Sequence, residues 1–310
     1  MLFKIQKIIK IQKKNKLKKK IVKKKIVKKK IVKKILKKIF KKKIAKKIAK
    51  KIEIIDEPGK DTIIIKPNFG LCNRLRFMFS YIQKLKDLNK FDTTKLVVCW
   101  PKDKECPYFY LDSLVKIPNV TFVKTNNISN KKINFSSGGY VHGYKGKNII
   151  NNILFSPRFS ILNEIKDIIK KLRNNYISVH IRRTDHVGLA KKNNQYTDDN
   201  NFINFLRINK NYNIFLATDS LDTQKKFKKL FNNRIKYIKW INNKSSEKRK
   251  TAFKDTIIDL FVCAFAKKFM PSGYSSYSEF IKLIRTDNHL LDDINFSPLQ
   301  IVDNYINKLK

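Results

Sequence analysis

The stretch Val179-His180-Ile181-Arg182-Arg183-Thr184-Asp185 closes an apolar run that starts at Tyr176. Such a run predicts a buried strand, and two guanidinium groups follow directly where the run ends. Arginine stays charged and offers a planar fork of donors, so it binds phosphate oxygens in pairs. The stretch therefore predicts a strand whose carboxyl end meets an anion. A strand that ends in a solvated basic pair is the alternative.

The first 52 residues differ in composition from the rest of the chain. The chain has 310 residues and a formal net charge of +47, and residues 1–52 hold 26 lysines without arginine or acid, which leaves +21 on the other 258. From residue 20 to 52, apolar residues recur in small groups every four or five positions, which favours a basic amphipathic helix. This segment suits an anionic membrane surface or a nucleic acid. A disordered, self-repelling tail is the alternative.

Composition also limits what the remaining 258 residues form. Their length suffices for one large domain or two of ordinary size, and their cationic surplus favours acidic partners. The four cysteines show neither a Cys-x-x-Cys pair nor a histidine at metal spacing, so we expect no zinc site and no disulfide framework. No apolar run is long enough to span a membrane, and residues 1–20 lack a signal-peptide core. These features predict a protein that is cytoplasmic or bound peripherally to a membrane surface.

Strand-like and helix-like segments alternate beyond Glu57-Pro58-Gly59. The expected strands are residues 62–66, 95–100, 177–181, 213–217, 234–240 and 268–270. The expected helices are residues 71–86, 201–208, 223–231, 251–266 and 275–284, while the chain is predicted to be irregular from residue 101 through residues 136–139. Alternation of this kind predicts parallel sheets with right-handed crossovers. We therefore expect an α/β fold with two Rossmann-like, doubly wound halves, residues 56–160 and 161–310, after a tail at 1–55.

In such a fold, ligands bind where parallel strands end. At the first of these junctions Gly70 permits a tight turn, and Asn73 and Arg74 open the next helix beside its donor-rich end. Asn73 as a helix cap is the alternative. At another junction Asp219 follows a buried strand, where it suits a ribose hydroxyl or a base edge, or else caps the following helix.

The last junction combines a carboxylate with hydroxyl groups. Asp259 lies in a helix that is apolar nearly all round, so we expect it to have a partner such as a base amine or an arginine. A solvated stripe shared with Asp255 is the alternative. Ser275 and Ser276 open the next helix and place hydroxyls and backbone amides where a phosphate would bind, unless they serve only as caps.

Taken in order, these motifs resemble those of the fucosyltransferase superfamily, which includes the α1,6 enzymes of N-glycan cores, the α1,2 enzymes and the protein O-fucosyltransferases. The resemblance spans residues 67–284 and rests on Gly70-Leu71-Cys72-Asn73-Arg74, His180-Ile181-Arg182-Arg183-Thr184-Asp185, Ala217-Thr218-Asp219, and Asp259 followed by Tyr274-Ser275-Ser276. It implies two Rossmann-like halves of the GT-B type, the first on the acceptor side and the second binding the nucleotide sugar. It also implies GDP-fucose as donor, inversion of the anomeric centre, and no metal or other cofactor.

The resemblance further implies a role for each motif residue. Arg182 would hold the β-phosphate and stabilise the charge that builds there as GDP departs. Arg182 and Asp185 are the predicted catalytic residues, and Arg183 would support the loop. The predicted substrate-binding residues also include His180 and Arg74, with Asn73 facing the phosphates or sugar, Asp219 and Asp259 near the nucleoside, and Ser275 and Ser276 at the phosphates.

The acceptor hydroxyl also calls for a base, and here the chain departs from the α1,6 pattern. Ala190 stands where the α1,6 enzymes have a glutamate. The substitutes nearby in the sequence are Asp185, His186, Asp198 and Asp199.

The sequence thus predicts an inverting glycosyltransferase that moves fucose from GDP-fucose to a hydroxyl of a glycan or protein acceptor. One alternative is the same fold acting on another nucleotide sugar. The other is a protein that binds nucleic acid or membrane through the basic tail, with a degenerate transferase body. No sequence-specific nucleic acid partner is expected.

Overall fold

The computed structural model describes residues 61–124, 133–145, 149–150, 155–184, 187–238, 252–290 and 295–310. The chain divides into two compact units, Met1–Lys60 and Asp61–Lys310, and every described residue belongs to the second. The predicted tail at residues 1–55, the predicted catalytic residue Asp185 and the candidate base His186 lie outside the described residues.

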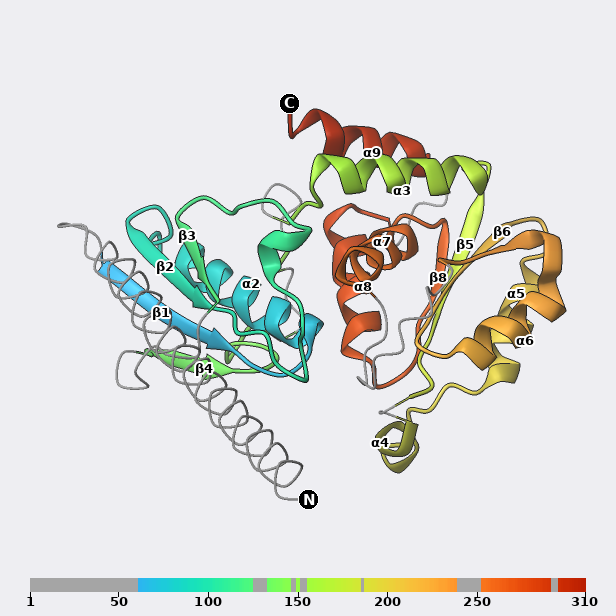
Figure 1. The fold of residues 1–310 in the computed structure, drawn as a ribbon, viewed down its shortest axis with the longest axis horizontal. Helices are drawn as coiled ribbons and strands as arrows, with labels where there is room; N and C mark the ends of the chain where they lie inside the picture. Colours follow the sequence, from blue (N-terminus) through green and yellow to red (C-terminus); the bar gives the residue numbers. More distant parts are fainter. Residues whose placement is uncertain are drawn as a thin grey trace, which may run out of the picture. The chain divides into compact units, whose positions relative to one another are not determined.

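The first sheet is parallel and has the strand order β3-β2-β1-β4 (Figure 1). Its strands are β1 (Asp61–Pro67), β2 (Thr94–Cys99), β3 (Val120–Val123) and β4 (Phe135–Ser137). Helix α2 (Leu71–Asp87) joins β1 to β2, and a 3-10 turn, η1 (Tyr110–Asp112), lies between β2 and β3. The crossover from β1 to β2 through α2 is the βαβ unit that the sequence predicts.

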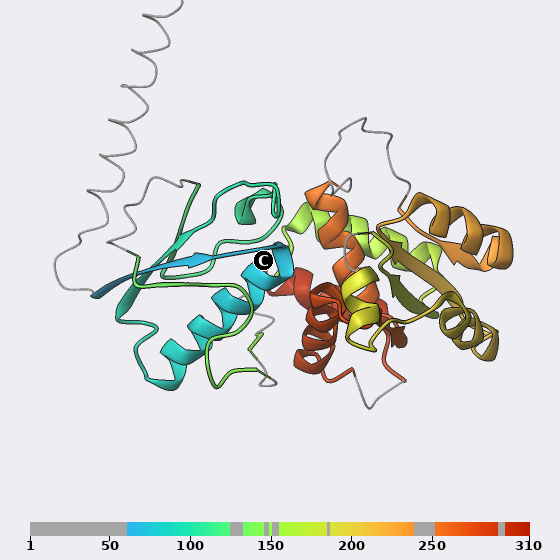
Figure 2. The ribbon, with the colours of Figure 1, turned by 90° about the horizontal axis from the view of Figure 1, so that it is seen from below.

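The second sheet is also parallel, with the order β7-β6-β5-β8. Its strands are β5 (Tyr176–Ile181), β6 (Asn213–Thr218), β7 (Ile235–Lys236) and β8 (Lys268–Met270). The helices of this part are α3 (Phe159–Lys171), α4 (Val187–Lys192), α5 (Asp199–Ile208), α6 (Leu221–Phe231), α7 (Phe253–Ala264), α8 (Ser276–Asp287) and α9 (Pro298–Asn307), with a 3-10 turn, η3 (Asn232–Arg234), before β7. Figures 1 and 2 show α5 and α6 on one side of this sheet and α7 and α8 on the other.

The alternation of side chains along β5 decides which helix layer each residue meets. Every residue of β5 is buried, and successive side chains of a strand point to opposite faces of the sheet. Ile177, Val179 and Ile181 pack in one apolar cluster with residues of α5 and α6. The hydroxyl of Ser178 donates to the carbonyl of Cys263 in α7, and His180 contacts Ser278 in α8. The polar residues of β5 therefore face the α7 and α8 layer.

Aromatic side chains join α2 to the helices beside the second sheet. The ring of Phe155 lies 5.3 Å from that of Phe79 in α2, and 5.2 Å from those of Phe261 in α7 and Phe280 in α8. Residues of both sheets and of these helices belong to one buried apolar cluster. This cluster thus connects the two sheets, while the face of the second sheet toward α5 and α6 has a cluster of its own.

The structure confirms the predicted α/β class with two parallel sheets. Several sequence-based expectations differ from it. The segment predicted as irregular contains β3, which pairs with β2, and β4, whose three residues pair with the end of β1. Only Ile235–Lys236 of the strand expected at 234–240 is a strand, although residues 239 and 240 are not described. Helices α3, α4 and α9 were not expected, and the boundary at residue 160 between two halves stays a prediction.

The structure also gives findings on membrane-spanning helices, on the cysteines and on metal-binding groups. Within the described ranges, no helix has both the length and the apolar character needed to cross a bilayer. All four cysteines are described, and each is buried without a disulfide. The described residues contain no group of three His, Cys, Asp or Glu side chains placed to hold a metal ion.

Candidate active site

The residues that follow β5 form a turn held by side chains from both neighbouring strands. Strand β8 ends at Met270, opposite Val179, and beyond it the hydroxyl of Ser272 accepts a hydrogen bond of 2.9 Å from the backbone N–H of Arg182. On the β6 side, the hydroxyl of Thr218 donates to the carbonyl of Ile181 at 2.6 Å. The side chains of Ser272 and Thr218 thus hold the chain at the end of β5, and they orient Arg182.

Asp219 completes the support of this turn. Its carboxylate accepts hydrogen bonds from the backbone N–H groups of Arg183, at 2.7 Å, and Thr184, at 3.4 Å, and from the Thr184 hydroxyl. The Nε of Arg182 lies 3.9 Å from the same carboxylate. The alternative that Asp219 caps the next helix is wrong, because the cap of α6 is Ser220. Both oxygens of Asp219 are directed at the turn, and contact with a nucleoside stays a prediction.

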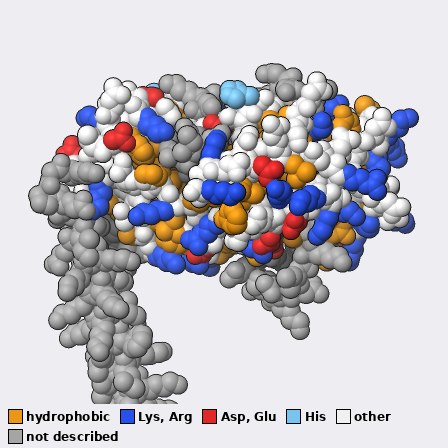
Figure 3. Space-filling model, turned by 90° about the horizontal axis from the view of Figure 1, so that it is seen from above, with side chains coloured by type: hydrophobic (Ala, Val, Ile, Leu, Met, Phe, Trp, Pro, Cys, Tyr) orange, Lys and Arg blue, Asp and Glu red, His pale blue; other side chains and the backbone are white. Residues whose placement is uncertain are grey.

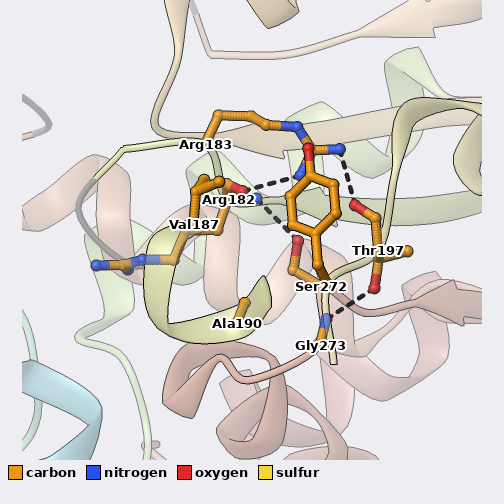
Figure 4. A pocket seen from close by; sticks show the side chains of 8 residues that line it. Arg182, Arg183, Val187, Ala190, Thr197, Ser272 and Gly273 are labelled. Carbon is orange, nitrogen blue, oxygen red and sulfur yellow. Dashed lines mark hydrogen bonds between the residues drawn. The ribbon is translucent and has the colours of Figure 1, made fainter. Parts of the chain in front are cut away.

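The two arginines leave the strand end in opposite directions (Figure 4). Arg183 donates to the carboxylate of Asp199 at 2.6 Å and to the carbonyl of Thr197 at 3.0 Å, and its guanidinium lies over the rings of Tyr196 and Phe202. These contacts tie the segment between α4 and α5 to the turn. Arg183 therefore supports the loop, whereas the Arg182 guanidinium points away from that loop.

A small open pocket adjoins the turn. Its empty space of about 230 Å³ includes open solvent, so it is a shallow site and not an enclosed cavity. The lining residues are Arg182, Arg183, Val187, Ala190, Tyr196, Thr197, Ser272 and Gly273.

Gly273 is placed where a side chain has no room. Its backbone N–H donates to the hydroxyl of Thr197 at 2.9 Å (Figure 4), and a Cβ at this position would lie 1.8 Å from the carbonyl oxygen of Gln195. The backbone of the α4–α5 loop thus packs directly on the turn after β8. This close approach is the physical reason for a glycine here.

Replacing Gly273 with alanine is expected to displace the loop at residues 195–197 and to remove the pocket that it lines. Since backbone atoms cannot yield as a flexible side chain does, we expect a loss of about 1–3 kcal/mol in the free energy of unfolding, measured by urea denaturation. Gly188→Ala is the matched control, because nothing lies within 4 Å of a Cβ there. An unchanged stability of Gly273→Ala would show that the loop does not pack as described.

A buried chain of hydrogen bonds connects the turn to His180. The backbone N–H of Ser272 donates to the hydroxyl of Ser278 at 3.1 Å, and this hydroxyl lies 2.7 Å from Nδ1 of His180. Burial is the main cause that lowers the pKa of His180 to about 3, and the neighbouring Arg182 and Arg183 lower it further against the opposing effect of Asp219. His180 is therefore neutral at physiological pH, and it contacts α8 instead of lining the pocket.

Ser275 and Ser276 lie at the start of α8. Ser275 is the N-cap of the helix, and its hydroxyl accepts from the backbone N–H of Ser278 at 3.4 Å, so the capping alternative is right for this residue. Ser276 is the first residue of the helix and is half-buried. Neither lines the pocket, and their contact with phosphate stays a prediction.

Asn73 and Arg74 lie in α2 and do not line the pocket. Arg74 is fully buried, and its guanidinium donates to the carbonyls of Phe69 and Pro101 and to the carboxylate of Asp103. In this structure Arg74 holds the loop after β1 to the loop after β2, which does not support a role in binding substrate.

Asn73 belongs to a cluster that joins α2 to α8. Its side-chain oxygen accepts from Arg76, which also forms an ion pair with Glu279. The N-cap of α2 is Gly70, so the alternative that Asn73 caps this helix is wrong. Contact of Asn73 with the phosphates or sugar stays a prediction.

Asp259 is buried in α7 and only 9% exposed, so the alternative of a solvated stripe is wrong for it. No described residue donates a hydrogen bond to its Oδ1. Burial, and after it the nearby Asp255, raises the pKa of Asp259 well above its usual range. No arginine among the described residues bonds to it, and a base amine as its partner stays a prediction.

The candidate bases in the described part of the chain are already engaged. Asp198 is exposed and caps α5 by accepting from the backbone N–H of Asn201. Burial alone would raise the pKa of Asp199, but hydrogen bonds from Lys226 and Arg183 lower it below its usual value. A carboxylate with a lowered pKa is a weak proton acceptor. Ala190, at the position of the α1,6 glutamate, lies in α4 and lines the pocket.

Sequence reasoning pointed to the segment at residues 270–276 and chose Ser275 and Ser276 from it, but it did not choose Ser272, Gly273 or Ser278 and it missed Thr197. Ser272 and Gly273 directly follow a predicted strand, the same signal that drew attention to Arg182. Thr197 carries no such signal, because only the folded loop brings it to Gly273.

Comparison with known proteins gives structural matches only. No protein-family profile matches the sequence, and no curated protein does. A solved structure similar to this chain is the NodZ alpha-1,6-fucosyltransferase soaked with GDP-fucose, with 14% identity over 73% of this chain and 93% of that one, at a TM-score of 0.49. Fucosyltransferase NodZ from Bradyrhizobium matches with 13% identity over 73% and 94% of the two chains and a TM-score of 0.47. POFUT1 in complex with GDP matches with 12% identity over 74% and 96% and a TM-score of 0.48.

Proposed function

We propose that this protein is a glycosyltransferase that binds the diphosphate of a nucleotide sugar at the turn after β5, uses GDP-fucose as donor, and inverts the anomeric centre. The observation that carries the proposal is Arg182 on a turn that Ser272 and Asp219 hold from both sides. A turn whose backbone is fixed before the ligand arrives loses little freedom when its arginine binds a phosphate.

The chemistry of the reaction gives this arginine its task. When the bond between the sugar and the nucleotide breaks, negative charge builds on the β-phosphate, and a positioned cation stabilises the transition state. Arg182 is the catalytic residue in this proposal. The acceptor is a hydroxyl of a glycan or protein. Asp185 as its base is a prediction.

The carboxyl of Asp259 supports the nucleotide part of the proposal. A buried oxygen without a donor is costly, and a base amine of guanine would supply the missing hydrogen bond. Such a hydrogen bond favours the ionised carboxylate and therefore lowers the pKa of Asp259 in the complex.

Replacing Asp259 with asparagine tests this contact. Because the folded pKa lies above the unfolded value of about 3.9, the folded state binds the extra proton, so wild type loses stability as the pH rises from about 4 through the folded pKa. We expect Asp259→Asn to exceed wild type in the free energy of unfolding at neutral pH while binding GDP more weakly. Asp222→Asn, exposed on α6, is the control. Unaltered GDP affinity in the stabilised variant would remove Asp259 from the nucleotide site.

The alternative of a nucleic-acid-binding protein assigns binding to the basic tail, which lies outside the described residues. On the face of the described residues shown in Figure 3, lysine and arginine side chains are spread over the surface. This face therefore does not test the alternative. Binding of the basic tail to an anionic membrane, with a cytoplasmic or peripheral location, remains part of the proposal.

Thermal unfolding of the full chain with different nucleotides tests the donor. GDP at about 100 times its dissociation constant is expected to raise Tm by about 5–10 °C. UDP and inorganic pyrophosphate serve as controls at raised ionic strength, which screens contacts with the lysine tail. Stabilisation by UDP instead of GDP would favour another nucleotide sugar, and stabilisation by every polyanion alike would favour the binding protein. Transfer of labelled fucose to an acceptor then decides the reaction.

A further inference from the structure

We propose that Ser278 is a positioning residue for Arg182, acting through Ser272 from outside the pocket. The proposal rests on the proposed function of Arg182. It is carried by a closed ring of contacts that runs from His180 along β5 to Arg182, across to Ser272, on to Ser278 and back to His180.

The first step is the link between Arg182 and Ser272. The pairing of β5 with β8 ends at Val179 and Met270, three residues before Arg182. Beyond that point the 2.9 Å hydrogen bond from the Arg182 backbone to the Ser272 hydroxyl fastens the end of β5 to the turn after β8. The position of the Arg182 backbone therefore depends on where this turn lies.

The second step is the link between that turn and Ser278. The hydroxyl of Ser278 accepts from the backbone N–H of Ser272 at 3.1 Å and contacts Nδ1 of His180 at 2.7 Å. Ser272, Ser278 and His180 are all at least nine-tenths buried. In such surroundings hydrogen bonds are strong and costly to break, so the ring couples the turn to the end of β5 as one unit.

Ser278 is not required for the helix in which it lies. Ser275 is the cap of α8, and it accepts from the backbone of Ser278, which alanine also provides. Alanine is the best helix former, so Ser278→Ala keeps α8 and removes only the hydroxyl at the centre of the ring. His180 is neutral, so the ring adds no positive charge beside the arginines.

The effect on the reaction follows from the geometry of the transition state. A small displacement of a charge-stabilising group reduces the stabilisation of the transition state more than that of the bound ground state. We therefore expect Ser278→Ala to lower kcat roughly 10- to 100-fold and to change KM for GDP-fucose much less. A second measurement does not need activity: hydrogen exchange of the Arg182 amide should become faster in Ser278→Ala.

A matched variant and a double-mutant cycle separate positioning from general destabilisation. Ser297→Ala removes the serine cap of α9, and it should lower stability without changing kcat or the exchange of the Arg182 amide. If Ser278 acts through Ser272, the effects of Ser278→Ala and Ser272→Ala on kcat are not additive. Should Ser278→Ala not fold, Ser278→Cys keeps the size and weakens the hydrogen bonds.

The outcomes separate this proposal from the proposed function. An active wild type whose Ser278→Ala variant keeps both its kcat and its Arg182 exchange rate overturns the positioning role. Additive effects of the two serine substitutions also overturn it. A wild type that neither binds GDP nor transfers fucose overturns the proposed function, while faster Arg182 exchange in Ser278→Ala would still show the coupling.

Discussion

Arg182→Ala is expected to lower the rate of fucose transfer by at least about 10²- to 10³-fold while the protein remains folded. The side chain of Arg182 is partly exposed at the pocket, and the turn itself is held by backbone contacts to Ser272 and Asp219, which the alanine variant retains. The loss thus falls on the charge that meets the phosphate. Steady-state transfer of labelled fucose and the urea midpoint give the two readouts.

Two further variants make this result specific. Arg182→Lys keeps the charge but loses the planar fork, so we expect intermediate activity. Arg207→Ala removes an equal charge from an exposed position on α5 and should leave transfer as in wild type. Wild-type activity in Arg182→Ala would exclude this guanidinium from the mechanism.

Arg74→Ala is expected to cost about 3–5 kcal/mol in the free energy of unfolding. Arg74 is fully buried, and its loss leaves the carbonyls of Phe69 and Pro101 without its hydrogen bonds and removes the ion pair with Asp103, whose other oxygen keeps its backbone donors. Urea denaturation of the variant against Arg207→Ala measures the effect. Should Arg74→Ala keep its stability and lose only activity, the substrate-binding role that the motif implies would be restored.

Arg74 also illustrates which part of the site the sequence predicts. The pattern of an apolar run followed by polar residues located the strand end at Arg182 and the adjoining Asp219, because parallel strands end at one edge of a sheet. The same reasoning assigned Arg74 to ligand binding. Its burial depends on the loop at residues 101–103, which no local pattern connects to α2.

Among the elements that were missed or given wrong bounds, the short strands are those whose conformation depends on distant partners. Strand β4 has three residues and β7 has two, and each is a strand only through pairing with a longer neighbour. The longer elements β1, α2, β5 and α7 were predicted because their apolar periodicity is local. Contacts such as that of Gly273 with Gln195 arise only once the chain has folded.

The packing of Phe155 against rings of α2, α7 and α8 has a consequence for how this unit melts. Because this side chain belongs to a buried cluster with residues of both sheets, separating the sheets would expose apolar surface on each. We therefore expect the two sheets to unfold together in a single calorimetric transition, so that neither could be exchanged alone without loss of stability.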